Sequence, residues 1–443
     1  MSSRRDFVKS ASASAAAFTI VPRHVLGGPG YTAPSDVVRY AAIGIGGKGD
    51  QDVQGIAKAG ASVAALCDVD WKTGRRNFAR FPDAKRFKDY REMFDKMGSE
   101  IDAVSVTTPD HSHAAAVMLA LKHNKHVFCQ KPLTRTLGET RTIMAEAKKR
   151  GVMTQMGNQG HAGIGTRLLR EWYEAGAIGE IKEVHYWTNR PIWPQGFNPD
   201  QLAYNVPPTM DWNLWLGPAP ERPYSPLIAP FAWRGFWDYG TGALGDIACH
   251  AMDAAFWALD LRNPTRISPD STALFEETAP KSSRIDYEFP ASGSRPAVRV
   301  SWRDGGMWPP KPAQLADVDT WPMGSDGGQM WVGKEGAMVA DIYGDNPRLL
   351  DAKKHEQFTK SPLPIKYPRS AGVYAEWINA ITNKGPAPMS NFAGHSGPLT
   401  EMVLYGCVAV RAGRVLELGP DGTIKTELPK EWVSPTYRAG WTL

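Results

Sequence analysis

Apolar and polar residues alternate over residues 37–156 in a repeated order of strand, turn and helix. Apolar runs predict strands at residues 37–43, 61–66, 101–106, 126–129 and 152–156. Polar and Ala-rich stretches predict helices at residues 50–59, 114–123 and 137–150. This order is typical of βαβ units, so we expect an N-terminal α/β domain of Rossmann type, with a doubly wound parallel sheet.

The pattern changes after residue 157. A strand is predicted at 181–189 and a helix at 240–259, with an irregular segment rich in Pro, Trp and Gly at 190–234. Further strands at 284–289, 297–302, 329–332 and 337–342 predict a C-terminal α/β domain with a mostly antiparallel sheet. Helices at 373–383 and 398–412 are expected to pack back on the body. The predicted divisions are 1–30, 31–160, 161–370 and 371–443.

The first thirty residues have the composition of an export signal. Arg4 and Arg5 stand between Ser3 and Phe7, and a weak apolar run extends to Ile20. This pattern predicts recognition by the twin-arginine translocon, which carries folded proteins, and hence a periplasmic or otherwise extracytoplasmic location. The alternative is a basic N-terminus that contains two arginines by chance. No run is long enough to predict a stable membrane span.

Composition narrows the classes of function. The chain has 443 residues, of which 42% are hydrophobic and 22% charged, as in soluble globular proteins. The net charge of +5 is modest and no basic cluster stands out, so nucleic acid is not an expected partner. The four cysteines lie singly in apolar segments without metal-ligand spacing, which predicts buried reduced thiols.

A glycine-rich turn joins the first predicted strand to the first helix. It reads Gly44-Ile-Gly-Gly-Lys-Gly49, and Asp68 ends the next strand. Glycines at such a turn let pyrophosphate approach the backbone, and the helix N-terminus supplies donors. An acid at position 68 accepts hydrogen bonds from the ribose hydroxyls and repels a 2′-phosphate, so NAD is favoured over NADP. Three nearby cations leave NADP possible: Lys72, Arg75 and Arg76.

These motifs, taken in order, resemble the Gfo/Idh/MocA oxidoreductase family. The matching pieces are the glycine turn, Asp68, Thr108-Pro109 with His113, Lys131-Pro132, and Asp246 with His250. The resemblance implies a C-terminal domain with a large open sheet, carbohydrate or cyclitol substrates, and a homodimer or homotetramer. The predicted cofactor contacts are Gly44, Gly46, Gly47, Gly49, Asp68, Thr107, Pro109, His113, Gln130, Lys131 and Asn158.

Hydride transfer from an alcohol needs a base for the hydroxyl proton and a cation for the developing oxyanion. Lys131 follows a strand end of the parallel sheet, where ligands bind in such folds. Asp246 and His250 are four residues apart and share one face of a helix. By the resemblance, Lys131 and His250 handle the proton, and Asp246 binds the substrate or orients His250. The alternative is that Asp246 and His250 are a surface pair.

One position departs from the family pattern. The family usually has Glu before the Lys-Pro pair, and this chain has Gln130. Loss of a carboxylate there could make Lys131 a better proton acceptor, or it could signal altered chemistry.

Other polar and aromatic side chains are candidates for substrate binding. Aromatic rings in the irregular segment could stack on sugar rings, although most are expected to anchor that segment. The predicted substrate contacts are Lys131, Gln159, His161, His185, Arg190, Trp193, Arg234, Asp246 and His250. No metal is predicted, because an Asp and a His four residues apart without an HExxH pattern are weak indicators of a metal site.

Three classes of function fit the sequence. The first is an exported NAD(P)-dependent oxidoreductase acting on a sugar or glycoside hydroxyl, with tightly bound cofactor. The second is a redox-neutral NAD-dependent glycosidase, which oxidises a ring carbon, eliminates the aglycone, adds water and reduces again. The third is a non-catalytic sugar sensor that retains NAD as a structural element.

Overall fold

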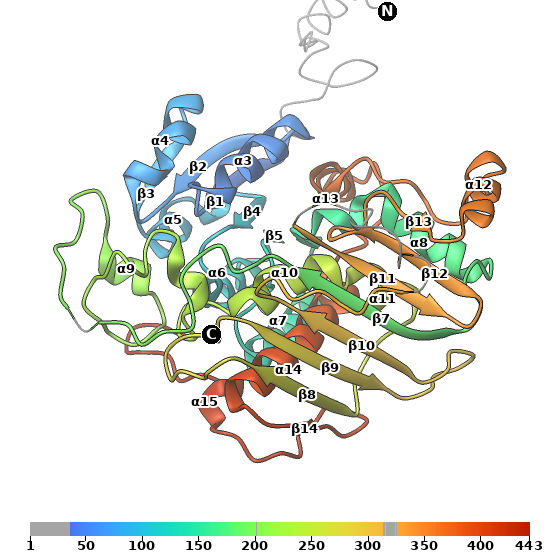
Figure 1. Cartoon of the computed structure of the whole chain (residues 1–443). Coiled ribbons are helices and arrows are strands. Elements are labelled where there is room, and N and C mark those ends of the chain that lie inside the picture. The colour runs from blue at the N-terminus through green and yellow to red at the C-terminus, as the bar shows by residue number, and fades with distance from the viewer. Residues whose placement is uncertain (1–35, 201, 313–314, 316–323, 325) are drawn as a thin grey trace, which may run out of the picture. The chain divides into compact units, whose positions relative to one another are not determined.

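The computed structural model describes residues 36–443 apart from 201, 313–314, 316–323 and 325 (Figure 1). The predicted export signal lies outside the described residues. Residues 39–443 form one unit, separate from residues 1–38, and all the elements below belong to it. Within the described part of the chain, no helix is both long and apolar enough to cross a bilayer.

Six parallel strands form the first sheet, in the order β3-β2-β1-β4-β5-β6. Their bounds are β1 Arg39–Ile43, β2 Ser62–Cys67, β3 Lys85–Phe87, β4 Ala103–Val106, β5 His126–Cys129 and β6 Thr154–Met156. The strand order reverses between β1 and β4, which is where dinucleotides bind in doubly wound sheets. The predicted Rossmann architecture is therefore confirmed.

Helices cover both faces of this sheet. They are α3 Lys48–Lys58, α4 Trp71–Arg80, α5 Tyr90–Met97, α6 Asp110–Lys122, α7 Leu137–Arg150 and, from the C-terminal part of the chain, α13 Val373–Ile381. Side chains alternate along β5, so Cys129 belongs to the main core while the Phe128 ring meets Tyr374 and Trp377 of α13 on the other face. Helix α13 thus takes the position of a Rossmann helix.

The second sheet has eight strands, in the order β13-β12-β11-β7-β10-β9-β8-β14. Their bounds are β7 Ile181–Thr188, β8 Arg266–Ser271, β9 Ser283–Phe289, β10 Val298–Arg303, β11 Gly327–Gly333, β12 Gly336–Asp341, β13 Arg348–Leu349 and β14 Leu416–Glu417. All neighbours are antiparallel except β10 and β7. The expected mostly antiparallel sheet is confirmed.

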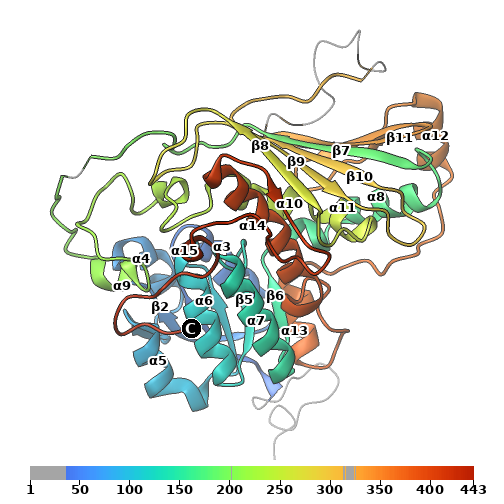
Figure 2. The ribbon, with the colours of Figure 1, turned by 90° about the horizontal axis from the view of Figure 1, so that it is seen from below.

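One face of the second sheet is covered by helices (Figure 2). These are α8 Ile164–Glu174, α10 Gly242–Ala251, α11 Asp253–Ala258 and α14 Gly397–Ala412. The remaining helices are α9 Trp212–Leu216, α12 Ala352–Lys360 and α15 Lys430–Val433. Short 3-10 turns occur at Gly98–Glu100, Gln159–Ala162 and Ala232–Gly235, and a π-helical turn, η7, at Phe392–Ser396.

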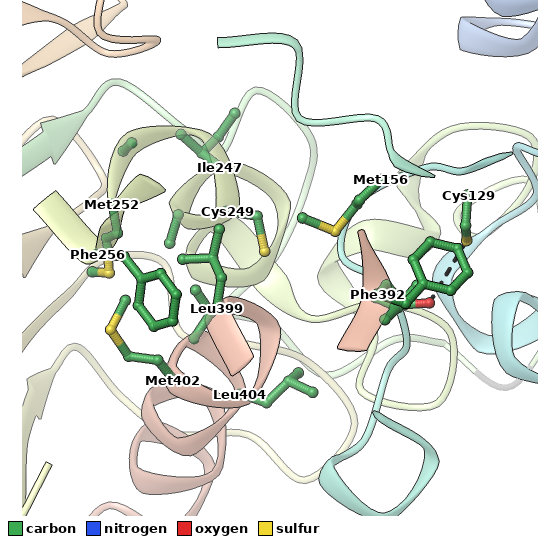
Figure 3. Close-up of a cluster of buried hydrophobic side chains, with 14 of the residues drawn as sticks. Cys129, Met156, Ile247, Cys249, Met252, Phe256, Phe392, Leu399, Met402 and Leu404 are labelled. Carbon is green, nitrogen blue, oxygen red and sulfur yellow. Dashed lines mark hydrogen bonds between the residues drawn. The ribbon is translucent and has the colours of Figure 1, made fainter. Parts of the chain in front are cut away.

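A single apolar cluster continues from one sheet to the other. Figure 3 shows Cys129 of β5 and Met156 of β6 in the same cluster as Cys249 of α10, Phe256 of α11 and Leu399 of α14. The four cysteines are buried and unpaired, as expected. Because this core is continuous, the end of β5 and helix α10 are held in a fixed relation.

Two features of the chain differ from the sequence prediction. The helix expected at 240–259 is broken at Met252 into α10 and α11. Several short elements were not predicted: α4, β3, α5, α8 and β8. The strands among them pair at or near sheet edges, so they carry little of the apolar pattern that marks a central strand.

Candidate active site

The glycine turn between β1 and α3 is a tight loop that depends on its glycines. Gly44 has φ of 78°, and a Cβ on it would lie 2.6 Å from the carbonyl oxygen of Thr107. A Cβ on Gly49 would lie 2.1 Å from the Gly44 carbonyl oxygen. Gly47 instead meets nothing within 4 Å, so open space lies over the loop at the start of α3. This geometry fits a pyrophosphate on the helix N-terminus.

Asp68 holds this loop in place. Its Oδ2 accepts hydrogen bonds from the backbone N–H groups of Ile45 (2.8 Å) and Gly46 (3.2 Å), and its Oδ1 accepts one from Asp70 N–H (2.9 Å). Burial raises the pKa of Asp68 to about 6 against the lowering effect of these bonds. Asp68 therefore shapes the loop, and its contact with the ribose hydroxyls stays a prediction.

A cavity of about 420 Å³ opens beside Gly47. Its walls come from the loop, from the start of α4 and from residues 207–230 of the irregular segment. That segment is tied down by three hydrogen bonds. Thr209 Oγ1 donates to Asp70 Oδ1 (2.7 Å), Trp71 N–H to the Thr209 carbonyl (3.2 Å) and Asp211 N–H to the Val69 carbonyl (2.9 Å). The basic residues noted in the sequence line this cavity: Lys72, Arg75 and Arg76.

Lys131 and Asp246 form an ion pair at the carboxyl end of β5. Lys131 Nζ lies 3.0 Å from Asp246 Oδ1 and donates to the Asp246 carbonyl oxygen at 2.7 Å. The two side chains are only 16% and 13% exposed. Arg234 Nε also donates to Asp246 Oδ1, at 3.3 Å. Burial raises the pKa of Asp246, but Lys131 and Arg234 outweigh it, so the pKa is lowered and the carboxylate is ionised.

His250 lies one turn beyond Asp246 on α10 and is buried. Burial and the charge of Lys131 lower the pKa of His250 to about 3, so its imidazole is neutral near pH 7. Its Nδ1 is buried and has no hydrogen-bond partner among the described residues. The ring packs on Tyr343, with centroids 4.9 Å apart. The geometry thus brings the three predicted catalytic side chains together and leaves one buried ring nitrogen of His250 without a partner among the described residues.

A second carboxylate, which sequence reasoning missed, belongs to the same cluster. Asp110 opens α6, is buried, and accepts a hydrogen bond from Thr241 Oγ1 at 2.9 Å. Burial and the nearby charge of Asp246 raise its pKa to about 7, while Lys131 and Arg234 oppose that rise. Its position directly after Thr108-Pro109 was the available signal.

Gln130 takes part in a buried hydrogen-bond network around Asp52. Gln130 Nε2 donates to Asp52 Oδ2 at 2.9 Å, and Asp52 is fully buried. The same carboxylate accepts from Lys48 Nζ (2.5 Å), Tyr374 OH (2.7 Å) and Thr107 Oγ1 (3.0 Å). A Glu at position 130 would set a second buried carboxylate against Asp52. Gln130 itself is neutral, and the carboxylate in this neighbourhood is that of Asp52, which Gln130 contacts directly.

Three of the other predicted cofactor contacts, Thr107, Pro109 and His113, lie near this point. Both ring nitrogens of His113 lie 2.8 Å from carbonyl oxygens, those of Pro132 and Thr108. His113 thereby braces the ends of β4 and β5, and Pro109 caps α6. The Thr108 hydroxyl is buried without a partner among the described residues.

The predicted substrate contacts are not all brought together. Arg234 joins the ion pair, and its guanidinium lies 5.9 Å from the centre of the buried Trp193 ring. His185 lies elsewhere, on β7, where it meets Glu183 (3.4 Å) and Arg303 (3.4 Å). Its neighbours Val184 and Tyr186 point into the main core, so His185 faces the side of the sheet away from the helices.

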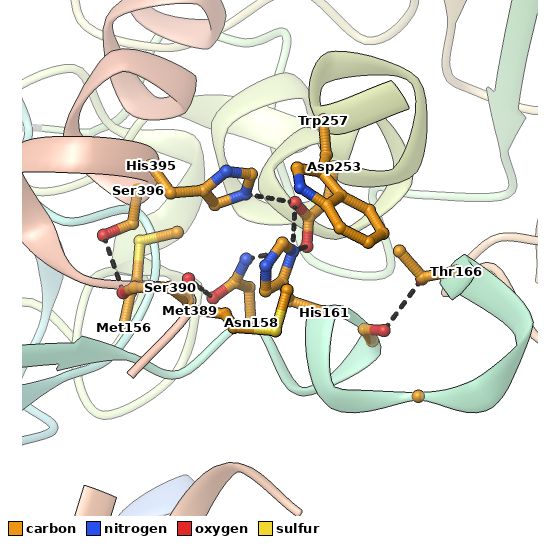
Figure 4. A network of polar contacts seen from close by, with 12 residues as sticks. Met156, Asn158, His161, Thr166, Asp253, Trp257, Met389, Ser390, His395 and Ser396 are labelled. Carbon is orange, nitrogen blue, oxygen red and sulfur yellow. Dashed lines mark hydrogen bonds and ion pairs between the residues drawn. The ribbon is translucent and has the colours of Figure 1, made fainter. Parts of the chain in front are cut away.

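Four further predicted residues have separate surroundings. Arg190 Nη1 donates to Asn189 Oδ1 at 2.9 Å. Gln159 is exposed on its 3-10 turn. His161 and Asn158 contact a different carboxylate, Asp253, in a buried network that also includes His395 (Figure 4). Sequence reasoning missed Asp253 and His395, which are far apart in the chain.

Comparison with known proteins places this geometry in a family. A model described as the oxidoreductase family's NAD-binding Rossmann fold matches residues 38–158, and one described as the family's C-terminal alpha/beta domain matches residues 189–295. The chain belongs to the Gfo/Idh/MocA oxidoreductase family, and its first domain is an NAD-binding Rossmann domain.

Individual relatives are similar over part of their length. An inositol 2-dehydrogenase of Salmonella typhimurium is 33% identical over 184 residues, which is 40% of this chain and 54% of the relative. A levoglucosan dehydrogenase of Pseudarthrobacter phenanthrenivorans is 28% identical over 177 residues, 40% of this chain and 37% of the relative. The chain therefore matches about half or less of the length of these relatives.

Solved structures share the fold. The WlbA dehydrogenase from Bordetella pertussis, in complex with NADH and UDP-GlcNAcA, has a TM-score of 0.59 and 15% identity, over 86% of this chain and 99% of that one. A levoglucosan dehydrogenase with NADH and levoglucosan has a TM-score of 0.57 and 18% identity, over the same shares.

The Asp52–Gln130 contact predicts the outcome of exchanging the two groups. We expect Gln130→Glu to lower the free energy of unfolding by about 1–3 kcal/mol, because two buried carboxylates would share one site. Asp52→Asn combined with Gln130→Glu should recover part of this loss, giving a coupling energy of about 0.5–3 kcal/mol in a double-mutant cycle of urea unfolding. Strict additivity of the two substitutions would contradict the contact.

The raised pKa of Asp110 predicts a pH dependence of stability. The pKa of Asp110 is about 7 in the folded protein and about 3.9 in the unfolded chain. The stabilisation that the protonated Asp110 gives to the folded state is therefore lost as pH rises from about 3.9 to about 7. The free energy of unfolding of Asp110→Asn, relative to that of the wild type, should therefore rise by about 1.4 kcal/mol per pH unit in that window. Above the window this difference should stay constant. Urea unfolding at a series of pH values measures this. The exposed control Asp95→Asn should show no such gain, and a flat difference for Asp110→Asn would refute the assignment.

Proposed function

We propose that the protein is an NAD-dependent dehydrogenase that oxidises a ring hydroxyl of a sugar, cyclitol or glycoside. The observation that carries this proposal is the Lys131–Asp246 pair beside the unpartnered ring nitrogen of His250. The names of the relatives, which are inositol and levoglucosan dehydrogenases, support a polyol substrate.

The side chains divide the work of the reaction. Bound NAD supplies the hydride acceptor. Neutral His250 accepts the hydroxyl proton of the substrate, and the Lys131 ammonium donates a hydrogen bond to the oxygen on which charge develops. Asp246 fixes the position of Lys131 through two contacts, to its carboxylate and to its carbonyl. Arg234 shares that carboxylate, so a substrate hydroxyl near Asp246 would meet both cations.

The same geometry supports a tightly retained cofactor. Residues 207–211 are bonded to residues 69–71 at the wall of the cavity beside Gly47. A dinucleotide seated there leaves only when these contacts open. A retained cofactor must be reset in each catalytic cycle, which is also what a redox-neutral glycosidase needs.

Substrate panels distinguish these functions. We expect purified protein with added NAD to form NADH stoichiometrically with at least one of inositol, levoglucosan and simple glycosides. Release of an aglycone without net NADH would instead identify the glycosidase, and neither signal would favour a sugar sensor.

Point variants test the residue roles. Lys131→Ala and His250→Ala should each lower kcat by at least about 10²-fold, because the first removes the cation at the developing oxyanion and the second removes the proton acceptor. Both should still retain NAD, measured by mass spectrometry after denaturation. Exposed control residues of the same types, Lys182→Ala and His123→Ala, should keep wild-type rates. Wild-type rates in both active-site variants would remove these residues from the mechanism.

We also propose export through the twin-arginine translocon, supported by Arg4 and Arg5 ahead of a weak apolar run. A reporter fused after residue 35 should reach the periplasm of a bacterium with this translocon. Arg4→Lys with Arg5→Lys should abolish that transfer, and unchanged transfer would contradict the proposal.

We also propose that the protein self-associates through the face of the second sheet that the helices leave uncovered. A monomer in light scattering would exclude this.

A further inference from the structure

One buried cluster of metal-type donors is not used by the proposed dehydrogenase mechanism. It consists of His161, Asp253 and His395, and its donor atoms lie within 4.8 Å of one another. His161 follows β6, Asp253 is the first residue of α11, and His395 lies in the π-helical turn η7 (Figure 4). We propose that this cluster is a binding site for a divalent transition metal of the Zn²⁺ class.

The donor set has the composition that such ions prefer. Two imidazoles and one carboxylate are a recurring set of three protein ligands, and they leave further positions for water or substrate oxygen. His161 Nδ1 lies 2.9 and 3.0 Å from the two oxygens of Asp253, and His395 Nε2 lies 2.5 Å from Oδ1. Both rings therefore turn one nitrogen to the same carboxylate, and donors on one ion span about 4 Å at most.

The orientation of the donors is fixed by neighbouring groups. Asn158 Nδ2 donates to Asp253 Oδ2 at 2.8 Å, and Ser390 Oγ donates to Asn158 Oδ1 at 2.5 Å. Contacts of this kind orient a ligating carboxylate in metal sites. The turn that carries His395 is anchored to β6, because Phe392 N–H donates to Thr154 Oγ1 at 3.0 Å. Turns of the π type are frequent at functional sites.

The three side chains of the cluster are shielded from bulk solvent. All three residues are buried, with the His161 and Asp253 side chains each 2% exposed and that of His395 8% exposed. Binding requires neutral imidazoles with lone pairs on His161 Nδ1 and His395 Nε2, and the ring protons then reside on the other nitrogens. A divalent ion would also compensate the buried charge of Asp253.

The position of the cluster ties it to the active site. Asp253 lies three residues after His250, across the break between α10 and α11. Asn158 follows β6, the strand beside β5, which ends at Lys131. An ion at this site would therefore stand close to His250 of the proposed catalytic centre, whose pKa the charge of Asp253 already affects.

The test uses the full chain, purified with an affinity tag that lacks histidine and stripped with a chelator. Titration with Zn²⁺ should load about one ion per chain by elemental mass spectrometry, and Co²⁺ should give the visible absorption of a low-coordinate histidine site. His395→Gln and His161→Gln should each weaken binding at least about tenfold, since each removes one of three ligands. The control His355→Gln, on α12, should bind as the wild type does.

Each outcome decides the proposal independently of turnover. Loading of well under one ion by the wild type, without a Co²⁺ spectrum, would overturn it and leave the cluster as a hydrogen-bonded network around Asp253. Equal binding by the wild type and both variants would also overturn it, because the ion would lie elsewhere. If a variant fails to fold, as judged by its thermal melt and retained NAD, the wild-type stoichiometry and Co²⁺ spectrum still decide.

Discussion

The proposed active site depends on the buried ion pair between Lys131 and Asp246. It joins the end of β5 in the first sheet to helix α10, which packs on the second sheet. Removing one partner of such a pair costs about 3–5 kcal/mol, because the remaining charge stays buried. The pair persists because Lys131 has two acceptors on Asp246 and because the continuous core holds the two elements in register.

Charges around this pair are arranged so that each group has a defined state. Asp246 is ionised between two cations, whereas His250 is neutral, because burial and Lys131 lower its pKa to about 3. Burial and the charge of Asp246 raise the pKa of Asp110 to about 7. Asp52 carries its negative charge beside Gln130 rather than beside Lys131. In the proposed mechanism this distribution supplies what alcohol oxidation requires, which is one group that accepts a proton and one cation that stabilises an oxyanion.

The sequence was sufficient for the parts of the fold that follow a local pattern. Apolar runs with a glycine turn identified β1, α3 and the cofactor loop, and the spacing of Asp246 and His250 placed both on one helix face. Contacts between distant segments left no such signal. Asp52 meets Gln130 only when two separated segments fold together, and His161, Asp253 and His395 meet only when three do. His185 lies on an alternating strand, but alternation alone does not say which sheet face meets the helices.

The proposed hydride-transfer site is formed by the end of β5 and helix α10, and a crystal structure with NAD bound tests this most directly. We expect the pyrophosphate at Gly47 and the nicotinamide ring beside Lys131 and His250. The carbon that accepts hydride should then lie about 3–3.5 Å from a substrate carbon whose hydroxyl meets both side chains. A nicotinamide ring bound away from the Lys131–Asp246 pair, with the pair intact, would contradict the account.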